Sequence, residues 1–269
     1  MGGTHGSEQI DHLRIQGARS QERKQPVVVE EPLEMRLNER SLAVTMRTPG
    51  HDIELSLGFL LSEGILEDPA VVLSIAHCEE NPNVTEVRTQ PNAAGVHPPS
   101  TRHFYAASSC GICGKSSIEA IRYRTPSVLA DPAQVSADTL ACLPERMKNA
   151  QILFEATGSL HAAGLFTASG KLMCLREDVG RHNAVDKVLG WAATRERLPL
   201  HEHILLVSGR VSFEIVQKAL MAQLPIVAAI SGPSSLAIEL ARESGMTLIG
   251  FLRGKTMNVY TGAKRIQVG

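Results

Sequence analysis

The sequence has few aromatic residues and no long hydrophobic run. Phe, Trp and Tyr make up only 4% of its 269 residues, so the core must consist of Leu, Val, Ile, Ala and Met. No apolar segment approaches the ~20 residues of a membrane-spanning helix. The polar first 25 residues lack the apolar segment of a signal peptide. We therefore expect a cytoplasmic protein that makes no membrane contact.

A large excess of either charge is also absent. The formal net charge at pH 7 is −1, which argues against a general nucleic-acid-binding or membrane-surface protein. The hydrophobic fraction of 43% is enough to bury a full core in one or two domains.

Cysteine is scarce as well. An odd number of cysteines, five, without a secretion signal indicates reduced thiols and not a disulfide framework. Only Cys110 and Cys113 form a close pair, in the segment SSCGICGK at residues 108–115. A Cys-x-x-Cys pair can bind a metal, cycle between dithiol and disulfide, or carry sulfur as a persulfide.

The residues around this pair favour redox or sulfur chemistry. The small glycines and serines would let the segment move, and Lys115 would favour the reactive thiolate. A structural zinc site needs four ligands, and the chain has no second Cys-x-x-Cys. A catalytic zinc needs only three protein ligands, which His161 or His182 could complete. Zinc binding and inert structural thiols therefore stay open as alternatives.

The pattern of strands and helices divides the chain into four parts. Residues 1–25 predict a flexible N-terminal arm, and 26–107 a strand-rich N-terminal part. Residues 108–143 predict a mobile loop with the cysteine pair and a connecting segment, and 144–269 an α/β core. Strands and helices alternate in the core, which predicts a largely parallel sheet covered by helices.

Two helices outside that alternation are predicted from their end signals. Residues 52–64 begin with Asp and end with Gly, which is typical of a helix with a capped first turn and a glycine stop. Residues 144–156 predict a helix that begins at Pro144.

Three polar segments follow predicted strands. Residues 176–183 are a dense charged cluster, while 208–212 and 231–235 place glycine and serine at the start of predicted helices. Free amides at helix N-termini bind anions, and α/β folds bind ligands at strand ends. Ordinary helix capping explains each segment equally well when it is taken alone. The two glycine turns belong to adjacent units, so we expect them to face the same crevice.

A fourth segment, residues 250–256, predicts a strand that leads into a basic loop. Arg253 suits a phosphate or pyrophosphate through its planar fork, and Phe251 could stack on a base. A solvated turn is the alternative. His161 resembles the start of a zinc-deaminase signature, but residue 163 is Ala where the catalytic Glu would stand. A deaminase is therefore disfavoured.

Together these segments resemble the formate dehydrogenase accessory sulfurtransferase family, FdhD. The resemblance runs from about residue 27 to the C-terminus. Its most specific stretches are SSCGICGK, REDVGRHNAVDKVLG, SGRVSFEIVQKA and GPSSLAIELA. Ser159 stands where the family tends to have glycine, and Gly232 where alanine is usual.

The resemblance implies a fold and an activity. The fold is α/β, a cytidine-deaminase-like core with helices on a mixed, largely parallel sheet, plus a smaller strand-rich N-terminal part. The activity is that of a sulfur carrier required for formate dehydrogenase. Persulfide sulfur from a cysteine desulfurase passes to the molybdenum cofactor, bis-molybdopterin guanine dinucleotide, before the cofactor enters formate dehydrogenase. Members of the family are cytoplasmic homodimers.

The resemblance also implies roles for particular residues. Cys110 would hold the persulfide, and Cys113 would assist or receive it. No metal-binding residue and no zinc is expected. The cofactor would contact Phe251, Leu252, Arg253, Gly254, Lys255 and Thr256. The alternative function is a chaperone that binds the molybdenum cofactor without transferring sulfur, in which case the two thiols would be dispensable.

Overall fold

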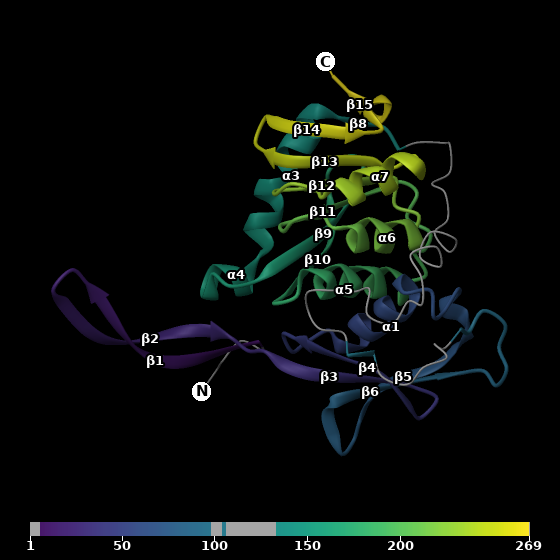
Figure 1. Cartoon of the computed structure of the whole chain (residues 1–269), viewed down its shortest axis with the longest axis horizontal. Helices are drawn as coiled ribbons and strands as arrows, with labels where there is room; N and C mark the ends of the chain where they lie inside the picture. The colour runs from purple at the N-terminus through teal and green to yellow at the C-terminus, as the bar shows by residue number, and fades with distance from the viewer. Residues whose placement is uncertain (1–5, 98–103, 106–132, 269) are drawn as a thin grey trace.

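The N-terminal residues form a long hairpin that stands away from the rest of the molecule. The structure is a computed structural model that describes residues 6–97, 104–105 and 133–268. Strands β1 (Ser7–Gln16) and β2 (Arg19–Val28) pair antiparallel over their whole length, and Figure 1 shows them projecting as an arm. A strand pattern was not evident in the sequence because both faces of the hairpin are exposed, and burial imposes no alternation on such strands.

A five-stranded sheet and one helix form the N-terminal part. The strand order is β5-β6-β3-β4-β7. The strands are β3 (Glu31–Leu37), β4 (Arg40–Arg47), β5 (Val72–Cys78), β6 (Asn81–Thr89) and β7 (Phe104–Tyr105), and a 3-10 turn spans Pro69–Val71. Helix α1 (Asp52–Ser62) covers this sheet and separates it from the core (Figure 1).

The two ends of α1 bear out the prediction only in part. Gly64 follows the helix with φ +68°, the left-handed conformation that ends helices. The predicted Asp cap is wrong. Asp52 is the first helical residue, and its carboxylate accepts two hydrogen bonds from Arg47 at 3.1 and 2.9 Å.

The core is a six-stranded sheet between two layers of helices (Figure 1). Its strand order is β10-β9-β11-β12-β13-β14. The strands are β9 (His161–Thr167), β10 (Leu172–Asp178), β11 (His203–Val207), β12 (Ile226–Ala229), β13 (Thr247–Arg253) and β14 (Thr256–Thr261). The helices are α3 (Ala137–Ala150), α4 (Ile152–Thr157), α5 (Arg181–Ala193), α6 (Phe213–Met221) and α7 (Ser235–Glu243). A 3-10 turn at Ala263–Arg265 leads to β15 (Ile266–Gln267), which pairs with β8 (Val135–Ser136).

Side chains alternate between the two faces of this sheet. Leu205 and Val207 of β11 lie in the cluster that contains α5, α6 and α7, whereas Ile204 and Leu206 lie in the cluster that contains α3. Because both faces are buried, the strand reads as a continuous apolar run.

The sheet is mixed, but only its centre is parallel. Strands β11, β12 and β13 pair parallel, whereas β9, β10 and β14 join antiparallel. The prediction of a largely parallel sheet is therefore wrong for the outer strands. The reason is that β9–β10 and β13–β14 are hairpins closed by short turns. Residues 254–255 are such a turn, and the β14 strand after them was not foreseen.

Helix α3 begins before the proline that was predicted to start it. The Ser136 hydroxyl caps the helix by accepting a hydrogen bond from the Thr139 amide at 3.0 Å. Pro144 lies inside the helix, which ends at Ala150, and α4 follows as a separate short helix. The serine cap, and not the proline, marks the start.

Helices α1 and α5 cross at two glycines. A Cβ atom on Gly58 would lie 1.8 Å from the carbonyl oxygen of Asp186, and one on Gly190 would lie 1.8 Å from that of Glu54. The two backbones can approach this closely only because both residues lack a side chain. This crossing holds the N-terminal part against the core.

A buried ion cluster ties α6 to the same crossing. The Lys218 ammonium lies 2.9 Å from the carboxylates of both Asp186 and Glu63, and it donates to the Ser62 hydroxyl at 2.9 Å. Asp186 and Lys218 are almost fully buried, at 2% and 3% exposed. Opposite charges and hydrogen bonds satisfy one another where water is excluded.

Candidate functional site

The predicted sulfur-carrying residues, Cys110 and Cys113, lie outside the described residues. The other thiols divide by exposure: Cys142 on α3 is exposed, Cys78 is half-buried and Cys174 is buried. Burial raises the pKa of the Cys174 thiol to about 12. A thiol with that pKa is almost entirely protonated at neutral pH, so Cys174 is a poor nucleophile.

The ends of the core strands bring the predicted turns together at one edge, here called the strand-end edge. It consists of the turns after β10, β11 and β12 and the β13–β14 turn, namely 178–181, 208–212, 230–234 and 251–256. Val211 pairs with Pro233 across the two glycine turns, the Val211 amide donating to the Gly232 carbonyl at 3.2 Å. The two glycine turns are therefore neighbours in space, and a shared crevice between them stays a prediction.

The β13–β14 turn packs on the second glycine turn through an exposed aromatic ring. Phe251 is 44% exposed and has a left-handed backbone, φ +53°. Its amide donates to the Ser231 carbonyl at 3.1 Å, and its ring lies so close to Gly232 that a Cβ there would be 2.6 Å away. The ring therefore has a fixed place beside the edge.

The other predicted cofactor contacts are not equivalent. Arg253 and Lys255 are exposed on the same turn, as are their neighbours Gly254 and Thr256. Leu252 is fully buried and belongs to the cluster under α3. Its side chain serves the core, so only its backbone is available to a ligand.

Two arginines lie near His161 at the strand-end edge. Burial lowers the pKa of His161, the charges of Arg181 and Arg210 lower it further, and the Asp178 carboxylate acts in the opposite direction. The ring also lies against Gly209, where a Cβ would be 3.3 Å from Nδ1. Among the described residues, the buried Nε of Arg181 has no hydrogen-bond partner. A guanidinium with a free buried N–H beside a second arginine is suited to an anionic ligand.

Two helices begin at this edge without a side-chain cap. These are α5, with Gly180 at its N-cap, and α6, with Ser212. The Ser212 hydroxyl instead lies 3.1 Å from Nε2 of His182. Burial, with Lys218 and Arg181, lowers the pKa of His182 to about 4, so the imidazole is neutral at pH 7. Uncapped helix starts leave amides that attract anions.

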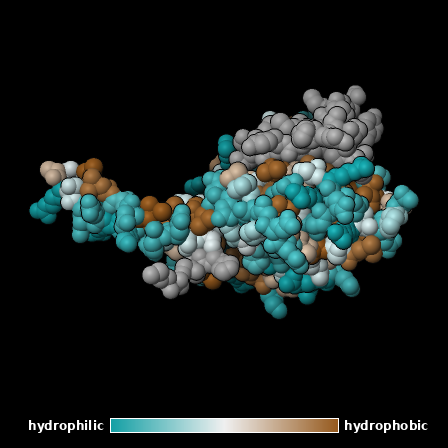
Figure 2. Space-filling view, turned by 90° about the horizontal axis from the view of Figure 1, so that it is seen from below, coloured by the Kyte–Doolittle hydropathy of each residue, from teal (hydrophilic) through white to brown (hydrophobic). Residues whose placement is uncertain are grey.

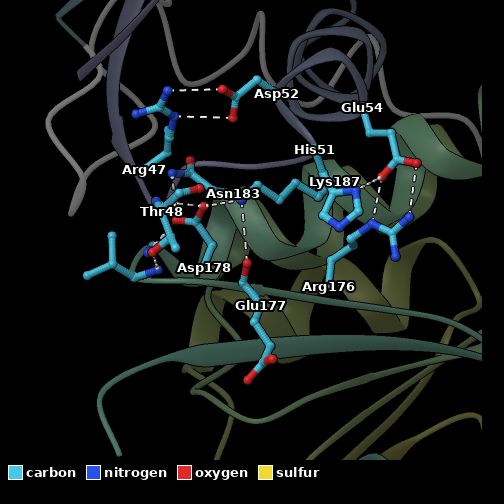
Figure 3. A network of polar contacts seen from close by, with 12 residues as sticks. Arg47, Thr48, His51, Asp52, Glu54, Arg176, Glu177, Asp178, Asn183 and Lys187 are labelled. Atoms are coloured by element: carbon cyan, nitrogen blue, oxygen red, sulfur yellow. Dashed lines mark hydrogen bonds and ion pairs between the residues drawn. The ribbon is translucent and has the colours of Figure 1, made fainter. Parts of the chain in front are cut away.

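The charged segment 176–183 is mainly a structural joint. Figure 3 shows Arg176, Asp178 and Asn183 of this segment beside residues of β4 and α1, whereas the Glu177 side chain points away from them. The Glu177 carboxylate accepts hydrogen bonds from the Leu153 and Phe154 amides at 3.0 and 2.8 Å. Asp178 is fully buried, lies 2.7 Å from the Lys187 ammonium and accepts from the Thr48 amide at 3.2 Å. Asn183 donates to the Met46 carbonyl at 2.7 Å. These charges are therefore buried rather than solvated, and they fasten the N-terminal part to the core.

A second ion pair of this joint lies nearer to solvent. The Arg176 guanidinium donates two hydrogen bonds of 2.6 and 2.9 Å to the Glu54 carboxylate, and His51 lies 3.4 Å from the same carboxylate (Figure 3). The sequence left two interpretations of this segment open, an ordinary helix-start loop with solvated charges and a ligand site. Within this segment, Arg181 lies near His161 and His182 lies against Ser212, so these two side chains at the start of α5 are available to the strand-end edge, whereas Asp178 serves the joint as well.

Comparison with known proteins defines the class to which this architecture belongs. Residues 28–267 match the FdhD/NarQ family. The chain is 53% identical over 252 residues to the sulfur carrier protein FdhD of Mycolicibacterium paratuberculosis, covering 91% of this chain and 93% of that protein. It is 46% identical over 243 residues to the sulfur carrier protein FdhD of Sulfolobus acidocaldarius, covering 90% and 91%.

A solved structure agrees with the fold. The crystal structure of a protein from Desulfotalea psychrophila, described as a formate dehydrogenase accessory protein, superposes with a TM-score of 0.79. The match covers 97% of this chain and all of the other at 26% identity. The chain belongs to the FdhD/NarQ family. No helix within the described residues is long and apolar enough to span a membrane.

Proposed function

We propose that this chain is a sulfur carrier required for formate dehydrogenase activity. In this proposal Cys110 takes persulfide sulfur from a cysteine desulfurase, with Cys113 assisting or receiving it. The sulfur then passes to the molybdenum cofactor, as bis-molybdopterin guanine dinucleotide, before the cofactor enters formate dehydrogenase. The sulfur-carrier name of relatives near 50% identity supports the first half of the proposal.

The residues at the strand-end edge support the second half of the proposal, which is binding of the molybdenum cofactor. A guanine dinucleotide presents a pyrophosphate and a planar base. Arg181 offers a buried N–H without a partner among the described residues, and α5 and α6 begin there without side-chain caps. The exposed ring of Phe251 lies beside them against Gly232. These groups fit an anionic ligand that carries an aromatic ring.

Sulfur transfer requires a thiolate that attacks an incoming persulfide. The Cys110 thiolate would attack the terminal sulfur of the desulfurase persulfide, and the desulfurase thiolate would leave. Neutral His182 and the cations near His161 would receive the cofactor, and the cationic field would draw the anionic phosphates to the edge.

The first experiment is intact-mass spectrometry after incubation with a cysteine desulfurase and cysteine. We expect a reducible gain of about 32 Da on the peptide that contains Cys110 and Cys113. The gain should vanish in Cys110→Ala and persist in Cys142→Ala, the matched change of an exposed thiol. A gain that followed Cys142 instead would refute the assignment.

A second comparison separates sulfur transfer from cofactor delivery alone. If the chain were only a cofactor chaperone, Cys110→Ala would still restore formate dehydrogenase activity in a strain that lacks the chain, whereas Arg253→Ala would not. We expect both variants to fail, because the carrier needs the thiol as well as the cofactor site.

A further inference from the structure

A pocket lies where α1, α5 and α6 end, and we call it the helix-end pocket. Helices α5 and α6 begin at the strand-end edge and end at this pocket. The 13 residues of α5 therefore separate it from the strand-end edge by about 20 Å, at a rise of about 1.5 Å per residue. Its volume of about 580 Å³ is in the range of small-molecule sites.

The floor of the helix-end pocket is apolar. Its apolar lining includes Leu61, Leu66, Leu189, Leu198 and Met221. On the face of the body seen in Figure 2, most exposed side chains are hydrophilic, and apolar ones reach the surface in separate areas. Water in an apolar pocket makes few favourable contacts, so a ligand with an apolar body would gain free energy by replacing it.

The pocket spans the boundary between the N-terminal part and the core. Leu61 is on α1 and Leu66 follows it in the N-terminal part, whereas Leu189 is on α5 and Met221 on α6. Ligand sites occur preferentially at such boundaries. An occupant would contact both parts of the molecule at once.

Backbone groups along the pocket are already paired. Leu66 forms a bridge with Val96, and the Glu67 amide donates to the Gly95 carbonyl at 2.9 Å. The Ala222 carbonyl accepts from the Leu200 amide at 2.9 Å. These groups are not available to pair with an extended peptide, so side chains must hold the ligand, as they do for a compact small molecule.

The side chains around the pocket favour a cation. None of its lining residues within the described ranges is basic, and three are acidic, namely Glu67, Asp68 and Glu196. Glu67 lies 2.8 Å from His97, and Asp68 accepts a hydrogen bond from the Ala70 amide. Glu196 is exposed, and its carboxylate has no partner among the described residues. Glu196 is therefore the carboxylate most available to a ligand.

The helices around the pocket add to this negative potential. The carboxyl end of a helix carries a partial negative charge, and the last turns of α1 and α5 contain no basic residue. The basic residue in the last turn of α6, Lys218, is paired with Asp186 and Glu63.

The nearest arginines in sequence have a partner of their own. Arg195 and Arg197 flank Glu196, but their guanidinium groups stack on the Trp191 ring, at 4.9 and 5.6 Å from its centroid. Neither is a lining residue of the pocket. The charge of Glu196 is therefore left for an occupant to neutralise.

We propose that the helix-end pocket binds a small organic cation, an amine or guanidinium group on an apolar body. The charged group would lie at Glu196, and the body would lie against Leu66 and Leu189. The opposite charge of the ligand and the apolar floor select this class over anions and over neutral polar molecules. The proposal does not depend on the proposed sulfur transfer.

Three ligands that differ in the charge of one end group test the proposal: 4-phenylbutylamine, 4-phenylbutanol and 4-phenylbutyrate. Isothermal titration of the full chain would measure their binding. We expect the amine to bind about 10-fold more tightly than the alcohol, because a hydrogen bond to a charged group contributes about 1.5–3 kcal/mol. The butyrate should not bind. Binding of the amine should weaken as salt rises.

Two variants place the ligand in the pocket. Glu196→Gln should weaken binding of the amine about 10-fold, for the same reason, and leave the alcohol unchanged. Glu145→Gln changes an exposed carboxylate on α3 and is the control. Ala70→Trp puts a large side chain at the pocket and should abolish binding. Ala263→Trp is the matched change in the other 3-10 turn, outside the pocket, and should bind normally.

Several results would overturn the proposal. One is a wild-type chain that does not bind the amine, and another is an alcohol that binds as tightly as the amine. Amine binding that survives Ala70→Trp, or that is lost equally in Ala263→Trp, would place the ligand outside the helix-end pocket. Unchanged binding in Glu196→Gln would show that this carboxylate does not select the cation.

Discussion

At the scale of single residues, one buried histidine makes stability depend on pH. Burial with nearby cations lowers the pKa of His182 from its ordinary 6.5 to about 4 in the folded chain. In the unfolded chain the same ring takes up a proton near pH 6.5. The unfolded state therefore binds more protons between these values, and stability present above pH 6.5 is lost as pH falls toward 4.

We therefore expect the free energy of unfolding to fall by about 2 kcal/mol between pH 7 and pH 4.5 on account of His182. His182→Asn keeps a polar partner for Ser212 and should flatten this dependence, as measured by urea unfolding at several pH values. His12→Asn, in the arm, is the control and should leave the slope unchanged. If the free energy of unfolding of His182→Asn depended on pH as steeply as that of the wild type, other groups would cause the acid sensitivity.

A second residue-scale prediction concerns the buried pair of Asp178 and Lys187. Lys187→Met would leave the Asp178 carboxylate in a site that is 0% exposed, and removal of one partner of a buried pair costs about 3–5 kcal/mol. The exposed pair of Arg88 and Glu39, 3.8 Å apart, is the control, and Arg88→Met should cost less than about 1 kcal/mol. If urea unfolding showed that Lys187→Met and Arg88→Met lose the same free energy of unfolding, the buried pair would not stabilise the contact between the N-terminal part and the core.

At the scale of elements, the glycine crossing of α1 and α5 should tolerate no side chain. Gly58→Ala or Gly190→Ala places a Cβ 1.8 Å from a backbone carbonyl, and backbone cannot move aside as a flexible side chain can. We expect a loss of about 3 kcal/mol or more in either variant.

The control for this crossing is Gly158→Ala. No atom lies within 4 Å of a Cβ at that position, but its φ of +70° is left-handed. The strain there should cost only about 1–2 kcal/mol. If Gly190→Ala unfolded at the same denaturant concentration as Gly158→Ala, the helices would have room to separate.

At the scale of the whole molecule, the strand-end edge is an assembly of turns from separate units. We expect it to bind guanosine diphosphate, the nucleotide part of the proposed cofactor. Arg181→Ala should weaken that binding about 10- to 150-fold, since a charge-assisted hydrogen bond contributes about 1.5–3 kcal/mol. Isothermal titration would measure it, with Arg88→Ala as the control on the N-terminal sheet. Unchanged binding in Arg181→Ala would place the nucleotide elsewhere.

Much of the core could be predicted from the sequence, because both faces of its strands are buried. The apolar run at His203–Val207 and the serine and glycine turn after it indicated a strand followed by a helix, and the structure has both. The arm could not be predicted, because no burial marks its strands. The strand β14 was hidden by the basic turn before it, which reads as a loop.

The sequence predicted the individual turns of the candidate site, but it did not show that all of them lie at one edge of the sheet. The residues named in those turns, such as Gly209 and Phe251, are at the strand-end edge. The segment 176–183 reads like a ligand loop because it is dense in charge, yet Asp178 and Asn183 serve the joint with β4. Charge in a sequence does not say whether its partner is a ligand or another segment of the chain.

The family, the close pair of cysteines and the alternation of strands and helices can be read from the sequence, since they depend on local motifs and on the period of burial. The tertiary structure is needed to show which turns meet, that Leu252 belongs to the core and that Lys187 lies against Asp178. It also decided that an apolar, acid-rimmed pocket forms where three helices end. These features join residues far apart in the chain, and their contacts depend on how the helices and sheets pack.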